Sequence, residues 1–125
     1  MKMPKILVVE DDHIMRMVVA GFAEHIGCHL TSVETCDEAL GLLAEEAFDL
    51  VLMDWQMIGT DGLECAAEIR SIEIPMERRT PIVAMTANVM PGHRDLALAA
   101  GMDDFLGKPF TMAEFQEMVA RFCSK

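Results

Sequence analysis

Short apolar runs alternate with amphipathic stretches five times along the chain, and this alternation limits the possible folds more than any other feature. The apolar runs lie at residues 5–10, 29–33, 49–54, 82–86 and 103–108. Three of them, at 5–10, 49–54 and 82–86, are almost continuously apolar, which is typical of strands that are buried on both faces. Helical patterns occupy the intervals, at residues 13–26, 35–46, 62–72, 91–99 and 111–122.

Strands that alternate with helices in this way predict a parallel sheet with helices on both faces. Right-handed crossovers favour the flavodoxin-like strand order 2-1-3-4-5. We therefore predict an α/β fold: a single doubly wound (βα)5 domain with a five-stranded parallel sheet, spanning residues 1–125. The length of 125 residues is near the usual size of one domain, and no linker or internal repeat divides the chain.

Local signals predict where the helices begin and end. Capping boxes, in which Glu follows a capping residue by three positions, occur at Thr35 and Glu38, Asp61 and Glu64, and Thr111 and Glu114. Gly27 predicts the end of the first helix. In that helix, the apolar residues that recur at helical spacing are Ile14, Met17, Val18 and Phe22.

Charge and hydropathy narrow the range of partners. The chain has 10 Lys and Arg against 21 Asp and Glu, a net charge of −11. Because binding to nucleic acid depends on basic residues that neutralise phosphates, we predict no direct nucleic acid binding. The excess acid instead suits a cation site or a basic partner. No apolar run reaches the roughly 18 residues of a membrane span, so we predict no membrane contact by this domain.

The cysteines suggest a cellular location. They are Cys28, Cys36, Cys65 and Cys123, and no two of them form a C-x-x-C pair. We predict that they are reduced and mostly structural. Since the start of the chain also lacks the pattern of a secretory signal, a cytoplasmic location is expected.

Polar residues follow four of the predicted strands at the point where each strand ends. They are Glu10, Asp11 and Asp12 after the first strand, Asp54 after the third, Thr86 after the fourth and Lys108 after the fifth. In a sheet of this kind, ligands bind beyond the carboxyl ends of the strands. We therefore expect these side chains to form one site.

The chemistry of that predicted site follows from its residue types. Several carboxylates in one crevice repel each other unless a cation joins them, and ligands that are all oxygen suit Mg²⁺. A carboxylate beside a cation at the end of a rigid strand can attack a phosphoryl group and form an acyl phosphate. This predicts Asp54 as the nucleophile, with Lys108 and Thr86 holding the phosphoryl oxygens.

Four segments together resemble the CheY-like receiver domain of two-component response regulators: 6-ILVVEDD-12, 52-LMDWQMIGTDGLE-64, 82-IVAMTAN-88 and 101-GMDDFLGKPF-110. The resemblance covers essentially the whole chain, in the family's order and spacing. It implies a domain that catalyses its own aspartyl phosphorylation and dephosphorylation with Mg²⁺ as cofactor. It also implies a histidine kinase or histidine phosphotransfer protein as phosphodonor, and a downstream protein or linked output domain that receives the signal.

The resemblance further implies a role for each matching residue. The residues expected at the metal are Glu10, Asp11, Asp54 and Gln56, the last through its backbone carbonyl. Asp54 is also the expected phosphoacceptor. The residues expected to respond to the phosphoryl group are Thr86, the switch hydroxyl, Phe105, the aromatic switch residue, and Lys108, which contacts the phosphoryl group.

The chain departs from the family at Ile58, where many receivers have proline, and Ile permits more backbone freedom in that loop. Residues 86–110 look most like receivers of hybrid histidine kinases or phosphorelay proteins, although a stand-alone regulator would have the same length. A degenerate receiver that acts only as a protein-interaction module would lack some active residues, and none is missing. A dehalogenase-type phosphatase needs a second Asp two residues after its nucleophile, where this chain has Gln56.

Overall fold

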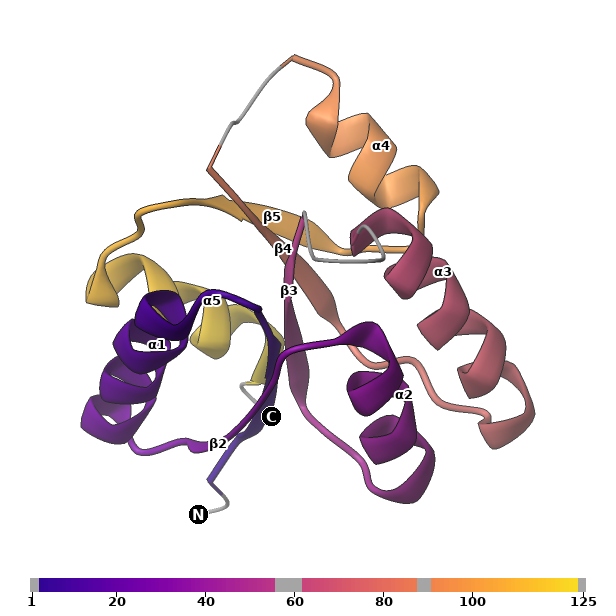
Figure 1. Ribbon diagram of the computed structural model, residues 1–125, viewed down its shortest axis with the longest axis horizontal. Coiled ribbons are helices and arrows are strands. Elements are labelled where there is room, and N and C mark those ends of the chain that lie inside the picture. Colours follow the sequence, from indigo (N-terminus) through magenta and orange to yellow (C-terminus); the bar gives the residue numbers. More distant parts are fainter. Residues whose placement is uncertain (1–2, 56–61, 88–90, 124–125) are drawn as a thin grey trace.

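The computed structural model describes residues 3–55, 62–87 and 91–123. Its strands are β1 (Lys5–Val9), β2 (His29–Val33), β3 (Leu50–Asp54), β4 (Ile82–Thr86) and β5 (Asp104–Gly107). All pairs of neighbouring strands are parallel, and the strand order is β2-β1-β3-β4-β5 (Figure 1). The predicted (βα)5 fold with flavodoxin-like order is therefore confirmed.

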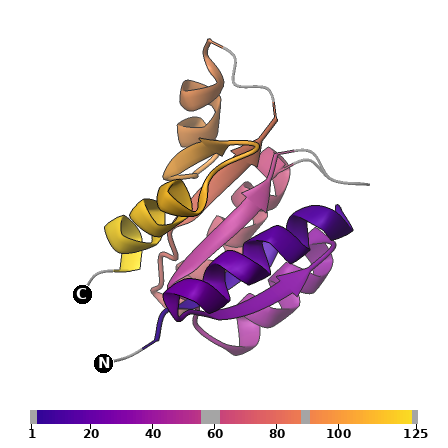
Figure 2. The ribbon, with the colours of Figure 1, turned by 90° about the vertical axis from the view of Figure 1, so that its left-hand side faces the viewer.

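Helices cover both faces of the sheet. They are α1 (His13–Ile26), α2 (Cys36–Glu45), α3 (Gly62–Glu73), α4 (His93–Ala99) and α5 (Met112–Cys123), with a short 3₁₀ turn, η1 (Ile74–Met76), after α3. Figure 2 shows α1 and α5 together in front of one face of the sheet. On the other face lie α2 and α3, and α4 lies near β5 (Figure 1). The turn η1 is the element that the sequence patterns did not predict.

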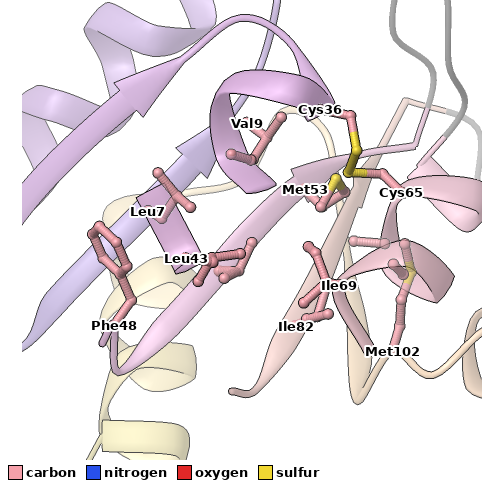
Figure 3. Close-up of a cluster of buried hydrophobic side chains, with 14 of the residues drawn as sticks. Leu7, Val9, Cys36, Leu43, Phe48, Met53, Cys65, Ile69, Ile82 and Met102 are labelled. Atoms are coloured by element: carbon pink, nitrogen blue, oxygen red, sulfur yellow. A yellow bond between two sulfur atoms is a disulfide. The ribbon is translucent and has the colours of Figure 1, made fainter. Parts of the chain in front are cut away.

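Burial of both faces explains why the strand runs are continuously apolar. Along β1, Leu7 and Val9 pack into the cluster beneath α2 and α3 (Figure 3). Ile6 and Val8 pack into the cluster beneath α1 and α5. All four side chains are fully buried. Burying one such side chain contributes roughly 1.5–3 kcal/mol to stability. Polar residues therefore collect where the strands end and the two apolar clusters stop.

Two predicted capping boxes are present. Thr35 Oγ1 accepts a hydrogen bond from the N–H of Glu38 at 3.2 Å, and Thr111 Oγ1 accepts one from the N–H of Glu114 at 3.1 Å. The Glu114 carboxylate in turn accepts a hydrogen bond from the N–H of Thr111 at 2.9 Å. As predicted, α1 ends at Gly27, whose φ of 81° lies in the left-handed region that favours glycine.

The helix predicted at residues 13–26 is present as α1, but three of the four apolar residues that indicate it are not buried. The side chains that are exposed to solvent, by 66%, 58% and 39% respectively, are Ile14, Met17 and Val18, which we call the α1 apolar surface. The helix instead buries Val19 and Ala23, and Phe22 packs beside them. Because α1 is apolar around much of its circumference, residue spacing alone permits more than one buried side, and its packing on the sheet selects one.

The prediction that all four cysteines are reduced is wrong for two of them. Cys36 and Cys65 form a disulfide, with 5.8 Å between their Cα atoms (Figure 3). The thiols of Cys28 and Cys123 are free. The pair lies 29 residues apart in the sequence, and only the packing of α2 against α3 brings it together. The cysteines therefore no longer support the expected cytoplasmic location.

No helix in the described part of the chain combines the length and the apolar character that crossing a bilayer requires. This finding agrees with the hydropathy of the sequence.

A network of charged residues joins α3 to the amino ends of β4 and β5, at the end of the sheet away from the polar strand ends. Arg70 on α3 donates hydrogen bonds to the Glu73 carboxylate at 2.7 Å and to the Asp103 carboxylate at 3.0 Å. It also donates to the carbonyl oxygens of Thr80 at 2.7 Å and Gly101 at 2.9 Å. One guanidinium thus links three separate chain segments.

Candidate functional site

The carboxyl ends of the central strands are level with each other, and this places the predicted site. β1 pairs with β3 up to Val9 and Met53, and β3 pairs with β4 up to Asp54 and Met85. Glu10 follows β1 directly, and Asp54 is the last residue of β3. The sheet therefore brings Glu10 and Asp54 to the same edge.

Three carboxylates come together at this edge. Glu10, Asp11 and Asp54 each offer an oxygen, and these oxygens lie within 4.8 Å of one another. Glu10 and Asp54 are buried and Asp11 is partly buried. Like charges this close favour a cation among them, and ligands that are all oxygen match hard divalent ions. The donor set therefore fits a metal ion, as the sequence predicted.

Some predictions fall on residues that the structure does not describe. The backbone carbonyl of Gln56, predicted as a metal ligand, lies outside the described residues. The same is true of Ile58, the position at which the chain departs from the family, and of Asp61, the predicted cap of α3. These predictions stay as they were made from the sequence.

Lys108 joins the acidic cluster from β5. Its ammonium donates hydrogen bonds to Glu10 Oε1 at 2.6 Å and to Asp54 Oδ1 at 3.1 Å. The Lys108 side chain is mostly buried, and its peptide bond to Pro109 is cis. Residues that lie 98 and 54 positions away from Lys108 in the sequence thus share one cation. This confirms that the ends of β1, β3 and β5 converge.

Burial and mutual contact shift the protonation of this cluster. Burial, together with the hydrogen bond and the charge of Asp54, raises the pKa of Glu10 from 4.5 to about 7, although Lys108 opposes the shift. For Lys108, burial alone lowers the pKa, but the carboxylates of Glu10 and Asp54 outweigh it and raise the pKa above its usual value. The site therefore keeps Lys108 charged and favours the protonated form of the Glu10 carboxyl.

This pKa shift predicts a dependence of stability on pH. Between pH 4.5 and about 7, folded Glu10 binds more protons than unfolded Glu10, so its contribution to the free energy of unfolding falls as pH rises. The uncharged variant Glu10→Gln lacks this loss. We expect its stability relative to wild type to increase from about pH 5 to about pH 8 in the presence of a chelator. Urea denaturation followed by circular dichroism measures this, and a constant or falling difference would contradict the assignment.

Thr86 and Phe105 lie on neighbouring strands. Thr86 ends β4 and is buried, and its carbonyl accepts a hydrogen bond from the N–H of Lys108 at 2.7 Å. Phe105 on β5 pairs in register with Ala84, so it lies two residues before the level of Thr86. Its half-buried ring packs against the cluster beneath α2 and α3. The structure thus places Thr86 beside Lys108, and Phe105 farther along the same two strands.

Sequence reasoning missed two residues that shape the site. Gly62 donates its N–H to the carbonyl of Trp55 at 2.8 Å, and a Cβ at Gly62 would lie 2.5 Å from the backbone oxygen of Asp54. Only glycine lets α3 begin so close to Asp54. Arg16 donates to the carbonyl of Glu10 at 2.9 Å and pairs with Glu34. A glycine at a helix start and an arginine on a helix are ordinary features of a sequence, so neither role had a visible signal.

Known proteins are similar to this chain in both sequence and structure. Residues 6–120 match the family model of the response regulator receiver domain. The sensor protein GacS of Pseudomonas syringae pv. syringae is 36% identical over 120 residues, which cover 95% of this chain and 13% of that protein. The sensor histidine kinase AruS of Pseudomonas aeruginosa is 38% identical over 112 residues, covering 90% of this chain and 11% of that protein. The chain thus spans only a small part of these relatives.

Solved structures agree with the sequence relatives. The crystal structure of the receiver domain of the sensor histidine kinase PA1611 from Pseudomonas aeruginosa, with a magnesium ion coordinated in its active site cleft, has a TM-score of 0.87 and 34% identity. That similarity covers 99% of this chain and 100% of the other. With the family model matched along nearly the whole length, the chain belongs to the response regulator receiver domain family of two-component signalling.

Proposed function

We propose that this receiver domain accepts a phosphoryl group on Asp54 from a phosphohistidine, in a Mg²⁺-dependent reaction, and changes conformation to pass on a signal. The observation that carries this proposal is the contact of Lys108 with both Glu10 and Asp54 inside the acidic cluster. The geometry offers a nucleophile, a place for a cation and a fixed ammonium within one small volume. An interaction module without chemistry would not need all three.

In the proposed reaction, a carboxylate oxygen of Asp54 attacks the phosphorus of the donor's phosphohistidine. An O–P bond forms as the N–P bond breaks, and the imidazole nitrogen leaves with the electron pair of that bond. Mg²⁺, when bound, would offset the negative charge of the transferring oxygens. Glu10, Asp11, Asp54 and the backbone carbonyl of Gln56 would hold the ion. Lys108 and Thr86 would hold the phosphoryl oxygens on the side facing β4 and β5.

The signal would leave the site through the switch residues. Thr86, drawn toward the phosphoryl group, and Phe105, on the neighbouring strand, would change position together. Their movement would reshape the surface of α4, β5 and α5, as a shift between two populated states. A downstream protein or a linked output domain would recognise that surface.

The donor would approach over α1. The N-cap of α1 is Asp12, two residues after Glu10, so the α1 apolar surface (Ile14, Met17 and Val18) begins beside the site. A histidine kinase or histidine phosphotransfer protein that delivers its phosphohistidine to Asp54 would cover this surface. A co-crystal structure holds the yeast histidine phosphotransfer protein Ypd1 together with the receiver domain of Ssk1. One chain of that complex is similar to this chain, with 25% identity and a TM-score of 0.86.

The relatives suggest the wider context. Since the sequence relatives GacS and AruS are sensor kinases many times longer than this chain, we propose that the domain serves a hybrid histidine kinase or a phosphorelay. The location we propose for its action is the cytoplasm. Its net charge of −11 argues against direct contact with nucleic acid.

Phosphorylation by a small-molecule donor tests the proposed function. Wild-type protein incubated with acetyl phosphate should gain one phosphoryl group in Mg²⁺ and none in excess chelator, as followed by intact-protein mass spectrometry. Failure to gain a phosphoryl group from acetyl phosphate or from any phosphohistidine donor would favour the alternative of a pure interaction module. Gain that does not depend on Mg²⁺ would refute the metal assignment.

Lys108→Ala should separate phosphorylation from signalling. The variant should fold and still be phosphorylated, since Asp54 and the metal ligands remain. Its response at α4, β5 and α5 should weaken, because no ammonium then connects the phosphoryl group to the end of β5. Amide hydrogen exchange of these elements, with and without phosphorylation, measures the response. Lys5→Ala is the matched control, since Lys5 pairs with Glu46 on the surface; an unchanged response in Lys108→Ala would rule out coupling through Lys108.

A further inference from the structure

Helix α4 is held to the rest of the domain by few side chains. Among its seven residues, all of them described, only Ala97 is buried, and Leu96 and Leu98 are large apolar residues that stay exposed. A helix with so little buried surface has low local stability. Its position therefore depends strongly on the contacts of its first turn.

Two adjacent residues in that first turn reach two different parts of the domain. The ring of His93 stacks on the ring of Trp55, with 4.9 Å between the ring centroids and 20° between the planes. Arg94 donates a hydrogen bond to the Asp104 carboxylate at 3.2 Å. One contact leads toward β3 and the other toward β5.

Each of these partners is fixed next to a functional residue. Trp55 directly follows Asp54, and its backbone is held by hydrogen bonds to Met85 and from Gly62, each of 2.8 Å. A movement of the Asp54 backbone would therefore also displace the Trp55 side chain. Since Trp55 is the single tryptophan of the chain, its fluorescence reports this contact directly.

Asp104 directly precedes Phe105. Its carboxylate is nearly buried, accepts a hydrogen bond from the N–H of Phe105 at 2.8 Å, and pairs with Arg121 on α5 as well as with Arg94 on α4. Charge-assisted hydrogen bonds of this kind are stronger than neutral ones. Asp104 thus joins α4, β5 and α5 at one point.

We propose that the first turn of α4 is a two-point link, in which His93 on Trp55 and Arg94 on Asp104 couple the phosphoacceptor to α5 through contacts separate from Thr86. His93 and Arg94 are positioning residues: neither contacts the reacting atoms, and both act by fixing α4 between the two ends of the link. The proposal rests on phosphorylation of Asp54 and names a route by which that site would be read out.

Because the two contacts act in series, breaking either one should have the same effect as breaking both. Spatial position alone does not establish coupling, and a double-mutant cycle is the appropriate test. The cycle uses His93→Ala, Arg94→Ala and the double variant in the full chain. The phosphoryl analogue beryllium fluoride with Mg²⁺ occupies the site, and amide hydrogen exchange of α5 is the response.

We expect each single variant to bind the analogue but to lose about twofold or more of the α5 response, the factor that corresponds to the weaker end of an aromatic pair. The double variant should lose no more than either single variant. His93→Phe, which keeps a ring against Trp55, should restore the response and the wild-type Trp55 emission. His25→Ala is the control: it removes an exposed imidazole at the C-terminal end of α1, away from the link, and should behave as wild type.

Other results would overturn the proposal. A wild-type response in His93→Ala would show that the stack carries no coupling. Losses that add in the double variant would show two independent local contacts instead of a link in series. If the wild-type protein itself fails to bind the analogue, the proposed function fails, and this outcome is distinct from a failure of the link.

Discussion

Asp54→Asn should abolish Mg²⁺-dependent phosphoryl incorporation while leaving the fold intact. The amide has nearly the same shape as the carboxylate but lacks the nucleophilic oxygen that forms an acyl phosphate. The loss should be complete within detection by intact-protein mass spectrometry, because Glu10, the other strand-end carboxylate in contact with Lys108, is fully buried and its raised pKa disfavours the ionised form that a nucleophile needs. Folding should be preserved, since the change removes one of three carboxylates that repel each other.

The control for this variant must also exchange one carboxylate for an amide. Asp37→Asn does so in the exposed first turn of α2, away from the acidic cluster, and should be phosphorylated as well as wild type. If Asp54→Asn is labelled equally well, the acceptor is misassigned, and Glu10 or Asp11 becomes the residue to examine. Peptide mapping of the labelled protein would then locate the phosphoryl group.

Arg70→Met should produce the largest loss of stability of any substitution proposed here. The substitution leaves the nearly fully buried Glu73 carboxylate without its guanidinium, and it removes hydrogen bonds to Thr80, Gly101 and Asp103. Removing one partner of a buried ion pair typically lowers the free energy of unfolding by about 3–5 kcal/mol. Urea denaturation followed by circular dichroism measures the change.

Two further variants show whether the loss comes from the buried charge. Arg79→Met removes a mostly exposed arginine that pairs with the same Asp103, and a surface pair of this kind contributes only about 0–1 kcal/mol. The double variant Arg70→Met with Glu73→Gln removes the stranded charge and should recover part of the loss. A loss in Arg70→Met no larger than that in Arg79→Met would mean that the network contributes little.

The sequence predicted those features that depend on the order of residues along one strand or helix. Polar residues that end apolar runs predicted the level strand ends, and with them the meeting of Glu10, Asp54 and Lys108. The capping pairs at Thr35 and Thr111 predicted helix starts because both partners lie within one turn. Once the strand order follows from the alternation, such local signals are enough to place most of the site.

Features that depend on how two elements pack were not predictable in the same way. The buried side of α1 was not predictable because apolar residues lie around much of the helix, and only its packing on the sheet selects Val19 and Ala23 for burial. The Cys36–Cys65 disulfide and the stack of His93 on Trp55 each join elements whose distance no single-sequence pattern reveals. The need for glycine at position 62 arises only from the approach of α3 to the Asp54 backbone.

The disulfide has a practical consequence for locating the phosphoryl group. It closes a covalent ring from Cys36 to Cys65, and Asp54 lies inside that ring. No Lys or Arg occurs between residues 16 and 70, so trypsin leaves the whole ring in one long peptide. A protease that cuts after Glu opens the ring and releases residues 47–64, which carry Asp54 and neither cysteine; the disulfide then joins only the fragments that hold Cys36 and Cys65. Phosphorylated Asp54 can therefore be located on that fragment without a reductant, whereas the mass of the tryptic peptide depends on whether the disulfide is reduced.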